Sequence, residues 1–360
     1  MIDLAPAQAP AARVPLGRLA KAVRIVSLLD LAAVALATGV LWLVSERTWW
    51  GSLFTFLPRH AFLVAPVLLL FVSLFTDRRS ILINLAGAAL VAGPLMGGRI
   101  PLAHIVGGHS PETGITIVSC NVQCFEPDFE SVLREIKALS PDVVAFQEAI
   151  GESPLLSRYF PGWHLLQEDQ YWIGSRYPVH RLDLCNTGVF PRPTAFSVRI
   201  DAPGSPFVLH DVHLTTPRYG FLKLTWHSVL DGSGPRYLES HTERRLAEAL
   251  RARAYVDRID ANGDDHPALP AIIAGDFNTP SVSQLYRAAW PGFTNAFNET
   301  GFGFGYTAPC TNHRHWFDDV PWVRIDHILA DDHWSVSACG VGRSKGSDHR
   351  LIWTILSLRK

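Results

Sequence analysis

The hydrophobic pattern divides the chain into two parts. Residues 25–44 form an almost unbroken apolar run of 20 residues with a single acid, Asp30, and that is the length needed to cross a bilayer. Two further apolar runs, 56–75 and 81–98, lie near the lower limit for crossing. The pattern therefore predicts a membrane region over residues 1–99 with about three transmembrane helices.

The rest of the chain has a different pattern. Residues 100–112 are rich in Gly and Pro and lack periodicity, which is typical of a linker. From residue 113 to residue 360, short β-type runs alternate with amphipathic helical segments such as 129–139 and 239–259. About 245 residues suffice for one domain with a sizeable core. Periodicity alone predicts an α+β domain here.

Polar side chains close several of the β-type runs. An apolar run ending at Ala274 is followed by Gly-Asp-Phe-Asn, and alternation places Asp276 and Asn278 on one face of the strand end. A single motif of this kind is more often a turn that caps the next helix. An ordered set, with each member at the end of a separate run, favours a shared site instead. The set is Asn121, Glu148, His213, Asp276, Asn278, Asp326, Asp348 and His349.

These residue types fit one kind of chemistry. Hydrolysis at phosphorus uses a metal ion to neutralise developing charge, a carboxylate to orient water and an imidazole to act on the oxygens. The segments Asp326-His327 and Ser347-Asp348-His349 offer acid and imidazole side by side. The sequence thus predicts a metal-assisted hydrolase.

The motifs also resemble those of a known family. They stand in the order Ser-x-Asn at 119–121, Gln-Glu at 147–148, His-Leu at 213–214, Gly-Asp-Phe-Asn at 275–278, Asp-His at 326–327 and Ser-Asp-His at 347–349. In these residues the chain resembles the endonuclease/exonuclease/phosphatase family, which includes deoxyribonuclease I, abasic-site endonucleases, inositol polyphosphate 5-phosphatases and neutral sphingomyelinases. The resemblance covers roughly residues 113–358 and implies a four-layer α/β/β/α sandwich, preceded here by the transmembrane region.

The resemblance implies a metal site. Glu148 would be the principal ligand of Mg²⁺ or Mn²⁺, hard cations that prefer oxygen and keep several waters. Asn121 would lie beside it and contact metal-bound water or a phosphate oxygen of the substrate. Asp326 would complete the metal or water network.

The resemblance also implies catalytic roles. Asp276 would orient and deprotonate the attacking water, while Asn278 and His349 would bind the phosphoryl group. Asp348 would fix the tautomer of His349, and His213 would be the general acid towards the leaving oxygen. Water would then attack phosphorus in line, without a covalent enzyme intermediate.

Charge predicts the orientation in the membrane. Basic residues concentrate in the tail at positions 13, 18, 21 and 24, and in the loop between the second and third apolar runs at 78 and 79. The positive-inside rule makes both segments cytoplasmic. Three crossings then place the second part outside the cytoplasm of a bacterial cell membrane, in a multi-pass protein. Two crossings would leave it in the cytoplasm.

Charge also bears on the substrate. From residue 101 onward the chain has 23 Lys and Arg against 29 Asp and Glu, a net charge of −6, whereas a nuclease usually shows a basic surplus or stripe. Residues 215–240 mix aromatic and cationic side chains, which suits a membrane interface or a lid over a lipid phosphate. An ordinary loop packed on the core is the alternative. Residues 312–316 could line the cleft.

The expected function is therefore a membrane-anchored, divalent-metal-dependent phosphoesterase acting on a phosphate or pyrophosphate ester, with a phosphorylated lipid as the favoured substrate. The layout resembles a bacterial branch that includes teicoplanin-resistance membrane proteins, which implies polyprenyl pyrophosphate or a phospholipid headgroup. An envelope-side nuclease acting on DNA or RNA and a catalytically silent membrane scaffold are the alternatives. The five cysteines lack metal-ligand spacing, which argues against a zinc site, and no protein partner is predicted.

Overall fold

A computed structural model describes residues 16–101, 114–261, 269–310, 320–344 and 346–359. Two compact units share the chain. The first comprises residues 1–39 and 59–96, and the second comprises residues 40–58 and 97–360. Each unit is described by itself.

The first unit is helical. Its elements are α1 (Leu16–Leu43, which runs on into the second unit), the 3₁₀ helix η2 (Arg59–Leu63), α3 (Val64–Thr76), α4 (Arg78–Leu90) and the π-helical turn η3 (Val91–Leu95). Among the described residues, two helical stretches, Gly17–Leu43 and Arg59–Thr76, are long and apolar enough to cross a membrane. The third apolar run of the sequence forms the 13-residue helix α4 and η3. A count of three crossings stays a prediction.

The polarity of this unit is inverted relative to that of a water-soluble helical bundle. Large apolar side chains point outward from all three long helices, among them Leu29, Leu36, Phe71, Phe75 and Leu82. Small polar side chains are buried, including Ser27 and Ser80, and Asn84 Nδ2 of α4 donates a 2.9 Å hydrogen bond to Ser73 Oγ of α3. Helices that face water bury their apolar stripe instead.

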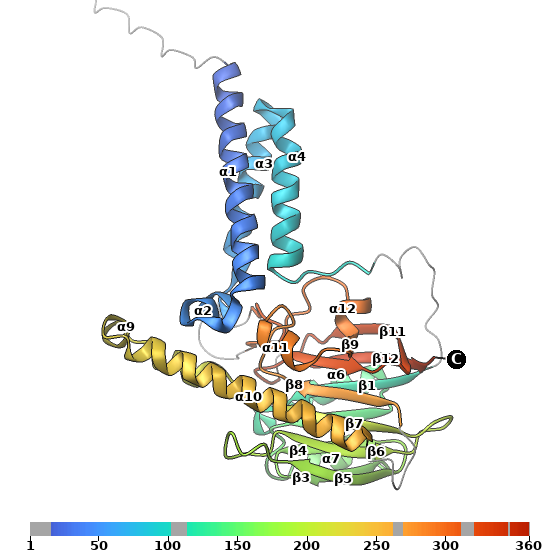
Figure 1. The fold of residues 1–360 in the computed structure, drawn as a ribbon. Helices are drawn as coiled ribbons and strands as arrows, with labels where there is room; N and C mark the ends of the chain where they lie inside the picture. Colours follow the sequence, from blue (N-terminus) through green and yellow to red (C-terminus); the bar gives the residue numbers. More distant parts are fainter. Residues whose placement is uncertain (1–15, 102–113, 262–268, 311–319, 345, 360) are drawn as a thin grey trace, which may run out of the picture. The chain divides into compact units, whose positions relative to one another are not determined.

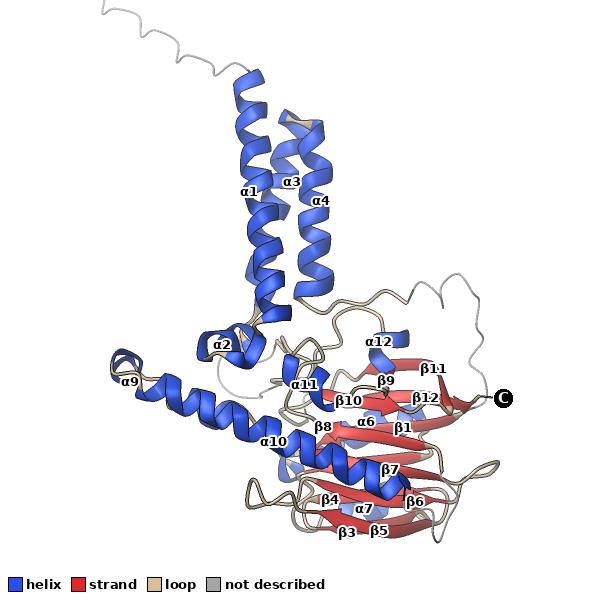
Figure 2. Ribbon diagram, in the orientation of Figure 1, coloured by secondary structure: helices blue, strands red, loops and turns tan. Residues whose placement is uncertain are grey.

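The second unit contains two six-stranded sheets of mixed direction (Figures 1 and 2). One sheet has the order β11-β12-β1-β2-β4-β3 and the other has the order β5-β6-β7-β8-β10-β9. The strands are β1 (Ile115–Asn121), β2 (Val143–Gln147), β3 (His164–Glu168), β4 (Tyr171–Ser175), β5 (Val179–Cys185), β6 (Ala195–Ile200), β7 (Phe207–His213), β8 (Ala271–Asp276), β9 (Thr294–Asn295), β10 (Asp326–Ala330), β11 (Trp334–Val341) and β12 (Ile352–Leu358).

Three hydrophobic clusters hold four layers together. The central cluster joins the two sheets, with residues such as Ile117 from one and Phe207 from the other. A second cluster packs the first sheet against α6 (Phe129–Leu139) and α7 (Pro154–Tyr159). A third packs the other sheet against α10 (Ser233–Ala261) and α11 (Gln284–Ala289). The predicted α+β class is confirmed, and the paired sheets are typical of the deoxyribonuclease I-like fold. The short helices are α8 (Arg218–Phe221), α9 (Trp226–Leu230) and α12 (Ala296–Thr300), with the 3₁₀ turn η4 (Gln123–Phe125).

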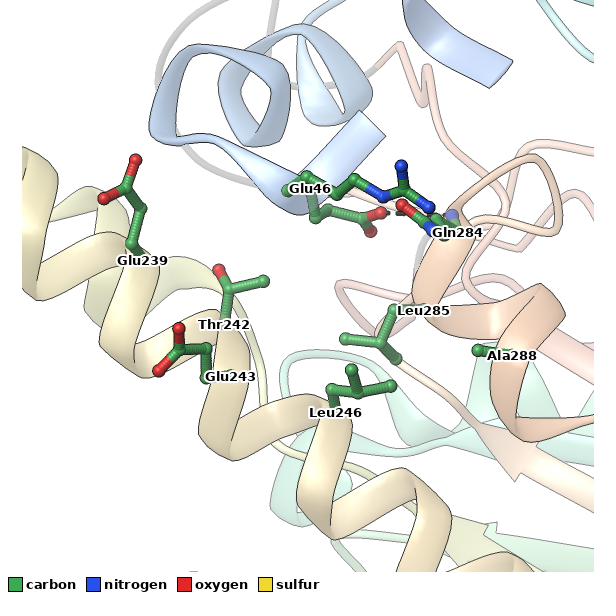
Figure 3. Close-up of a pocket in the computed structure, with 9 residues that line it drawn as sticks. Glu46, Glu239, Thr242, Glu243, Leu246, Gln284, Leu285 and Ala288 are labelled. Carbon is green, nitrogen blue, oxygen red and sulfur yellow. Dashed lines mark hydrogen bonds between the residues drawn. The ribbon is translucent and has the colours of Figure 1, made fainter. Parts of the chain in front are cut away.

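Residues 40–58 belong to this second unit, although they directly continue α1. They form the 3₁₀ turn η1 (Ser45–Arg47) and α2 (Trp49–Phe56). The buried carboxylate of Glu46 accepts hydrogen bonds from Ser45 Oγ at 2.6 Å and from Gln284 N of α11 at 3.2 Å. The side chains of Glu46 and Gln284 line a cavity of about 310 Å³, together with Leu246 and Leu285 (Figure 3). The turn η1 is therefore fixed to α11 by buried polar contacts within the second unit.

Candidate active site

The strand register brings the predicted residues to one edge of the sandwich. Strands β1 and β2 are parallel, as are β7 and β8, so their carboxyl ends share an edge; His213 pairs with Asp276 in register. The antiparallel strand β10 begins at this edge, with Asp326 opposite Asp276. A cavity of about 630 Å³ opens here, which we call the catalytic cleft. Its lining includes Glu148, His213, Asp276, Asn278, Asp348 and His349.

Two amides hold the carboxylates of the cleft. Asn121 Nδ2 donates to Glu148 Oε1 at 3.0 Å and to Asp276 Oδ2 at 3.2 Å. Asn278 Nδ2 donates to Asp276 Oδ2 at 3.0 Å and to the carbonyl oxygen of Leu214 at 2.8 Å. An amide nitrogen has only two protons, so both donors of Asn278 are already used. In this arrangement Asn278 positions Asp276, whereas the sequence led us to expect that it holds a phosphoryl oxygen.

The backbone at this edge adopts uncommon conformations. Glu148 and Asn278 have φ values of 53° and 50°, in the left-handed region that non-glycine residues seldom occupy. Gly275 has φ 140°, and a Cβ there would lie 1.9 Å from the carbonyl oxygen of Val212. Strain of this kind clusters at functional sites, where the surrounding structure maintains it.

His349 is paired with Asp326. Its Nδ1 lies 2.9 Å from Asp326 Oδ2, and its Nε2 lies 3.7 Å from Asp276 Oδ2. Burial lowers the pKa of His349, but the carboxylates of Asp326 and Asp276 outweigh burial and raise this pKa well above its ordinary value. The two carboxylates therefore favour the protonated form of the imidazole.

This pairing corrects the partner expected for His349. Asp348 was expected to fix the ring, but its carboxylate accepts from Ser347 Oγ at 3.4 Å and its backbone N–H donates to Gln123 Oε1 at 3.2 Å. Asp348 lines the cleft without bonding to the imidazole. The antiparallel pairing of β8 and β10 delivers Asp326 to the ring instead.

His213 is held in one orientation by Gln170. Gln170 Nε2 donates to the carbonyl oxygen of Pro193 at 2.9 Å, so Gln170 Oε1 faces the imidazole and accepts from His213 Nδ1 at 2.6 Å. Burial, with the charges of Arg192 and His349, lowers the pKa of His213 well below its ordinary value. The Nε2 atom of the ring lies 3.6 Å from both Glu148 Oε1 and Asp276 Oδ2. The general-acid role expected for His213 stays a prediction.

The site fits a divalent cation. Asp276, Asp326 and His349 are buried, and one ligand atom of each lies within 4.8 Å of the others. Burial raises the pKa of Asp276 to about 7, against the charge of His349 and together with the neighbouring Asp326. A cation would relieve this accumulation of negative charge, which Glu148 extends, and hard divalent ions prefer carboxylate oxygens. The cluster is therefore consistent with a divalent metal site.

The cleft contains further residues that sequence reasoning missed. Gln170 and Arg192 line it beside His213, and Ile150 lies at its rim. The available signal for Arg192 was its position between Pro191 and Pro193, which fixes the backbone on both sides. Residues 312–316, which were expected to line the cleft, lie outside the described residues.

Comparison with known proteins supports a family assignment. The family model described as the endonuclease/exonuclease/phosphatase family matches residues 118–349. No curated protein matches the chain with significance. Similar solved structures include a mannosyl-6-phosphatase of Bacteroides thetaiotaomicron, with 14% identity over 68% of this chain and 100% of that one and a TM-score of 0.46. The 3′ phosphatase NExo from Neisseria has 17% identity, the same two coverages and a TM-score of 0.48. TDP2 from C. elegans has 15% identity over 76% of this chain and 84% of that one, with a TM-score of 0.48.

The family match covers more than half of the chain, from the fourth residue of β1 to His349, and it spans the eight polar residues gathered at the edge of the sandwich. The chain belongs to the endonuclease/exonuclease/phosphatase family, and it is a metal-dependent phosphoesterase.

Proposed function

We propose that the enzyme is anchored in a membrane and hydrolyses a phosphate or pyrophosphate ester of a lipid-linked substrate. One observation carries this proposal: the rim of the catalytic cleft is apolar. Ile150, Tyr219 and Leu222 line the cleft and are each more than half exposed. Trp226 and Leu230, on the neighbouring helix α9, are also exposed. A fully polar substrate would leave this apolar rim in contact with water, whereas the acyl or prenyl chain of a lipid would cover it.

The first unit supports membrane anchoring. Many of its large apolar side chains are exposed, and small polar side chains such as Ser27, Ser73 and Ser80 are buried, which suits helices surrounded by lipid. Such a surface in water would expose far more apolar area than soluble proteins tolerate. An enzyme and a lipid substrate confined to one membrane also meet more often than they would in solution.

We further propose an extracytoplasmic location at a bacterial cell membrane. The helical run from α4 through η3 continues from Arg78 to Leu95, and we take it as the third crossing. Three crossings from a basic, cytoplasmic tail place the catalytic unit outside the cytoplasm. Labelling of single cysteines from either side of sealed vesicles tests this, because the two-crossing alternative exposes the catalytic unit on the opposite side.

The metal site follows from the donor set. Glu148 would be the principal ligand of Mg²⁺ or Mn²⁺, with Asn121 and Asp326 contributing oxygens. When bound, the ion supplies positive charge to the phosphoryl oxygens and to the developing leaving group.

The remaining side chains would handle water and protons. Asp276, held by Asn121 and Asn278, would orient the attacking water and accept its proton. The charged imidazole of His349 would donate from Nε2 to a phosphoryl oxygen, while Asp326 holds Nδ1. Asp348 lines the cleft and would face the substrate, and it would not orient the imidazole of His349.

The proposal is tested by phosphate release from detergent-purified protein with Mg²⁺. Farnesyl pyrophosphate, farnesyl phosphate, sphingomyelin, and single- and double-stranded DNA serve as substrates, with Asp276→Asn as the blank. We expect turnover of a lipid substrate and none of DNA. Turnover of DNA alone would support the envelope-side nuclease, and equal activity of the wild type and the blank would support the silent scaffold.

A further inference from the structure

The catalytic cleft contains two cations that no carboxylate of the described residues pairs with. Arg192 and Arg218 both line the cleft beside His213, and neither guanidinium forms an ion pair or a hydrogen bond within the part of the chain that the structure describes. The Nη1 atom of Arg192 is buried without a hydrogen-bond partner there. A buried donor left unsatisfied costs about 1–3 kcal/mol, and more when it is charged, so an unpaired arginine in a cleft indicates an anionic ligand.

Nearby acids are already engaged. Arg192 acts electrostatically on the buried carboxylate of Glu248. Burial raises the pKa of Glu248, and the hydrogen bonds from Thr215 and the charge of Arg192 only partly oppose this rise. Both of its oxygens accept from Thr215, at 2.8 Å from the backbone N–H and 3.0 Å from the hydroxyl. Glu148 belongs to the proposed metal site, and Asp276 is the proposed base, held by Asn121 and Asn278. None of these acids is left to satisfy Arg192.

The position of Arg192 is fixed by the framework that orients His213. The carbonyl oxygen of Pro193 accepts from Gln170 Nε2 at 2.9 Å, and Gln170 Oε1 accepts from His213 Nδ1. The carbonyl oxygen of Thr194 accepts from the backbone N–H of His213 at 3.0 Å. Arg192 is therefore built into the wall next to the reacting groups. Such preorganisation favours a specific ligand over casual ion binding.

We infer that Arg192, assisted by Arg218, binds a second phosphate next to the one that is hydrolysed, so that the substrate is a pyrophosphate ester with an apolar chain. This inference rests on the proposed function, since the apolar rim supplies the site for the chain. The described lining holds no other Lys or Arg, and a nucleic acid would be expected to need a longer row of cations. The two cations of the cleft match the charge of one further phosphate group beside the metal site.

The reaction balances with groups already in place. Water adds to the terminal phosphorus, and the bond from that phosphorus to the bridging oxygen breaks. The bridging oxygen keeps the electron pair and leaves as part of the monophosphate ester, while orthophosphate is released. The water proton passes to Asp276 and then to solvent. Arg192 stabilises the charge that develops on the leaving phosphate, which needs no proton of its own.

Binding and turnover together test the inference. The kcat/KM values for farnesyl pyrophosphate and farnesyl phosphate are compared in wild type, Arg192→Gln, Arg192→Lys and Arg181→Gln. The last is a charge-matched control, because Arg181 is exposed, pairs with Glu168 and does not line the cleft. We expect Arg192→Gln to lower kcat/KM for the pyrophosphate about 10–100-fold and that for the monophosphate less than about 3-fold. Arg192→Lys should recover part of the loss, and Arg181→Gln should match wild type.

A second measurement separates this inference from the proposed function. The dissociation constant of a non-hydrolysable farnesyl methylenediphosphonate, with Mg²⁺ present, does not depend on turnover. Weaker binding in Arg192→Gln, with the farnesyl monophosphonate unaffected and the melting temperature unchanged, supports the second-phosphate site even if no lipid is hydrolysed. Equal losses for both ligands, or no loss for either, would overturn it.

Discussion

Asp326 Oδ2 lies 2.9 Å from Nδ1 of His349, across a gap of 23 residues in the sequence. The contact exists because β10 pairs antiparallel with β8, so that Asp326, the first residue of β10, lies opposite Asp276, the last residue of β8. It favours the protonated form of the imidazole and directs its other nitrogen towards Asp276. The same contact distinguishes Asp326 from Asp348, which is adjacent to the histidine in sequence yet bonds elsewhere.

Replacing these two acids should therefore have unequal effects. Asp326→Asn removes the charge that favours protonated His349, so kcat should fall about 100-fold or more. Asp348→Asn keeps the ring in place and should cost about 10-fold or less. Steady-state kinetics on one substrate gives both values. An equal loss in the two variants, or a larger loss in Asp348→Asn, would contradict the pairing.

Removal of the metal should abolish activity, and re-addition of the metal should restore it. Treatment with a chelator followed by titration of Mg²⁺ or Mn²⁺ measures the apparent affinity. Glu148→Gln should weaken that affinity about 10–100-fold, because it removes the charge of the proposed principal ligand. Glu152→Gln, on the exposed loop after β2, is the control and should bind metal like wild type. Activity that survives complete metal removal would exclude the mechanism.

Gly275 should tolerate no side chain. A Cβ there would meet the Val212 carbonyl oxygen at 1.9 Å, and backbone cannot move as a flexible side chain can. We expect Gly275→Ala to lose about 3 kcal/mol of stability and the activity with it. Gly292→Ala isolates the conformational cost, because Gly292 also has positive φ but no atom within 4 Å of the added Cβ. It should cost about 1 kcal/mol. Similar melting temperatures for the two variants would refute the steric argument.

Acid should destabilise the catalytic unit through His327. This buried ring bonds Asn295 and the carbonyl oxygen of Thr279, and burial with Arg324 lowers its pKa to about 3. The unfolded chain, with a histidine pKa near 6.5, then binds more protons than the folded one below about pH 6.5. Stability should fall as the pH drops from about 6.5 towards 3, by up to about 1.4 kcal/mol per pH unit.

Melting temperatures measured in detergent from pH 7.5 down to pH 4.5 test this assignment. His327→Gln should lower the melting temperature at pH 7.5 and show a shallower decline towards acid than wild type. Parallel curves for the two proteins would mean that other groups carry the acid sensitivity.

Each polar residue of the candidate site closes an apolar run of the sequence. Asp276 and Glu148 could be placed at strand ends from local pattern alone. The partner of His349 could not, because register between β8 and β10 is a property of the sheet and leaves no local trace. Arg192 was missed because it lies in a loop between two prolines, without periodicity or a motif.

The organisation of the N-terminal part was also only partly readable. Hydropathy identified the long apolar run of α1 and the run that contains α3. It gave no indication that residues 40–58 join the catalytic unit, since the contacts of Glu46 with Gln284 depend on tertiary packing. Hydropathy reflects the free energy of transferring each side chain to an apolar environment, so it does not register a hydrogen bond between residues far apart in the sequence.

The central claim is that the apolar rim of the cleft binds the chain of a lipid substrate. The most direct measurement is kcat/KM for farnesyl pyrophosphate and for the short-chain dimethylallyl pyrophosphate, in wild type and in Leu222→Glu. We expect the charged rim to lower kcat/KM for the long chain about 10-fold or more and to leave kcat/KM for the short chain nearly unchanged. Equal effects on both substrates, or none on either, would contradict it.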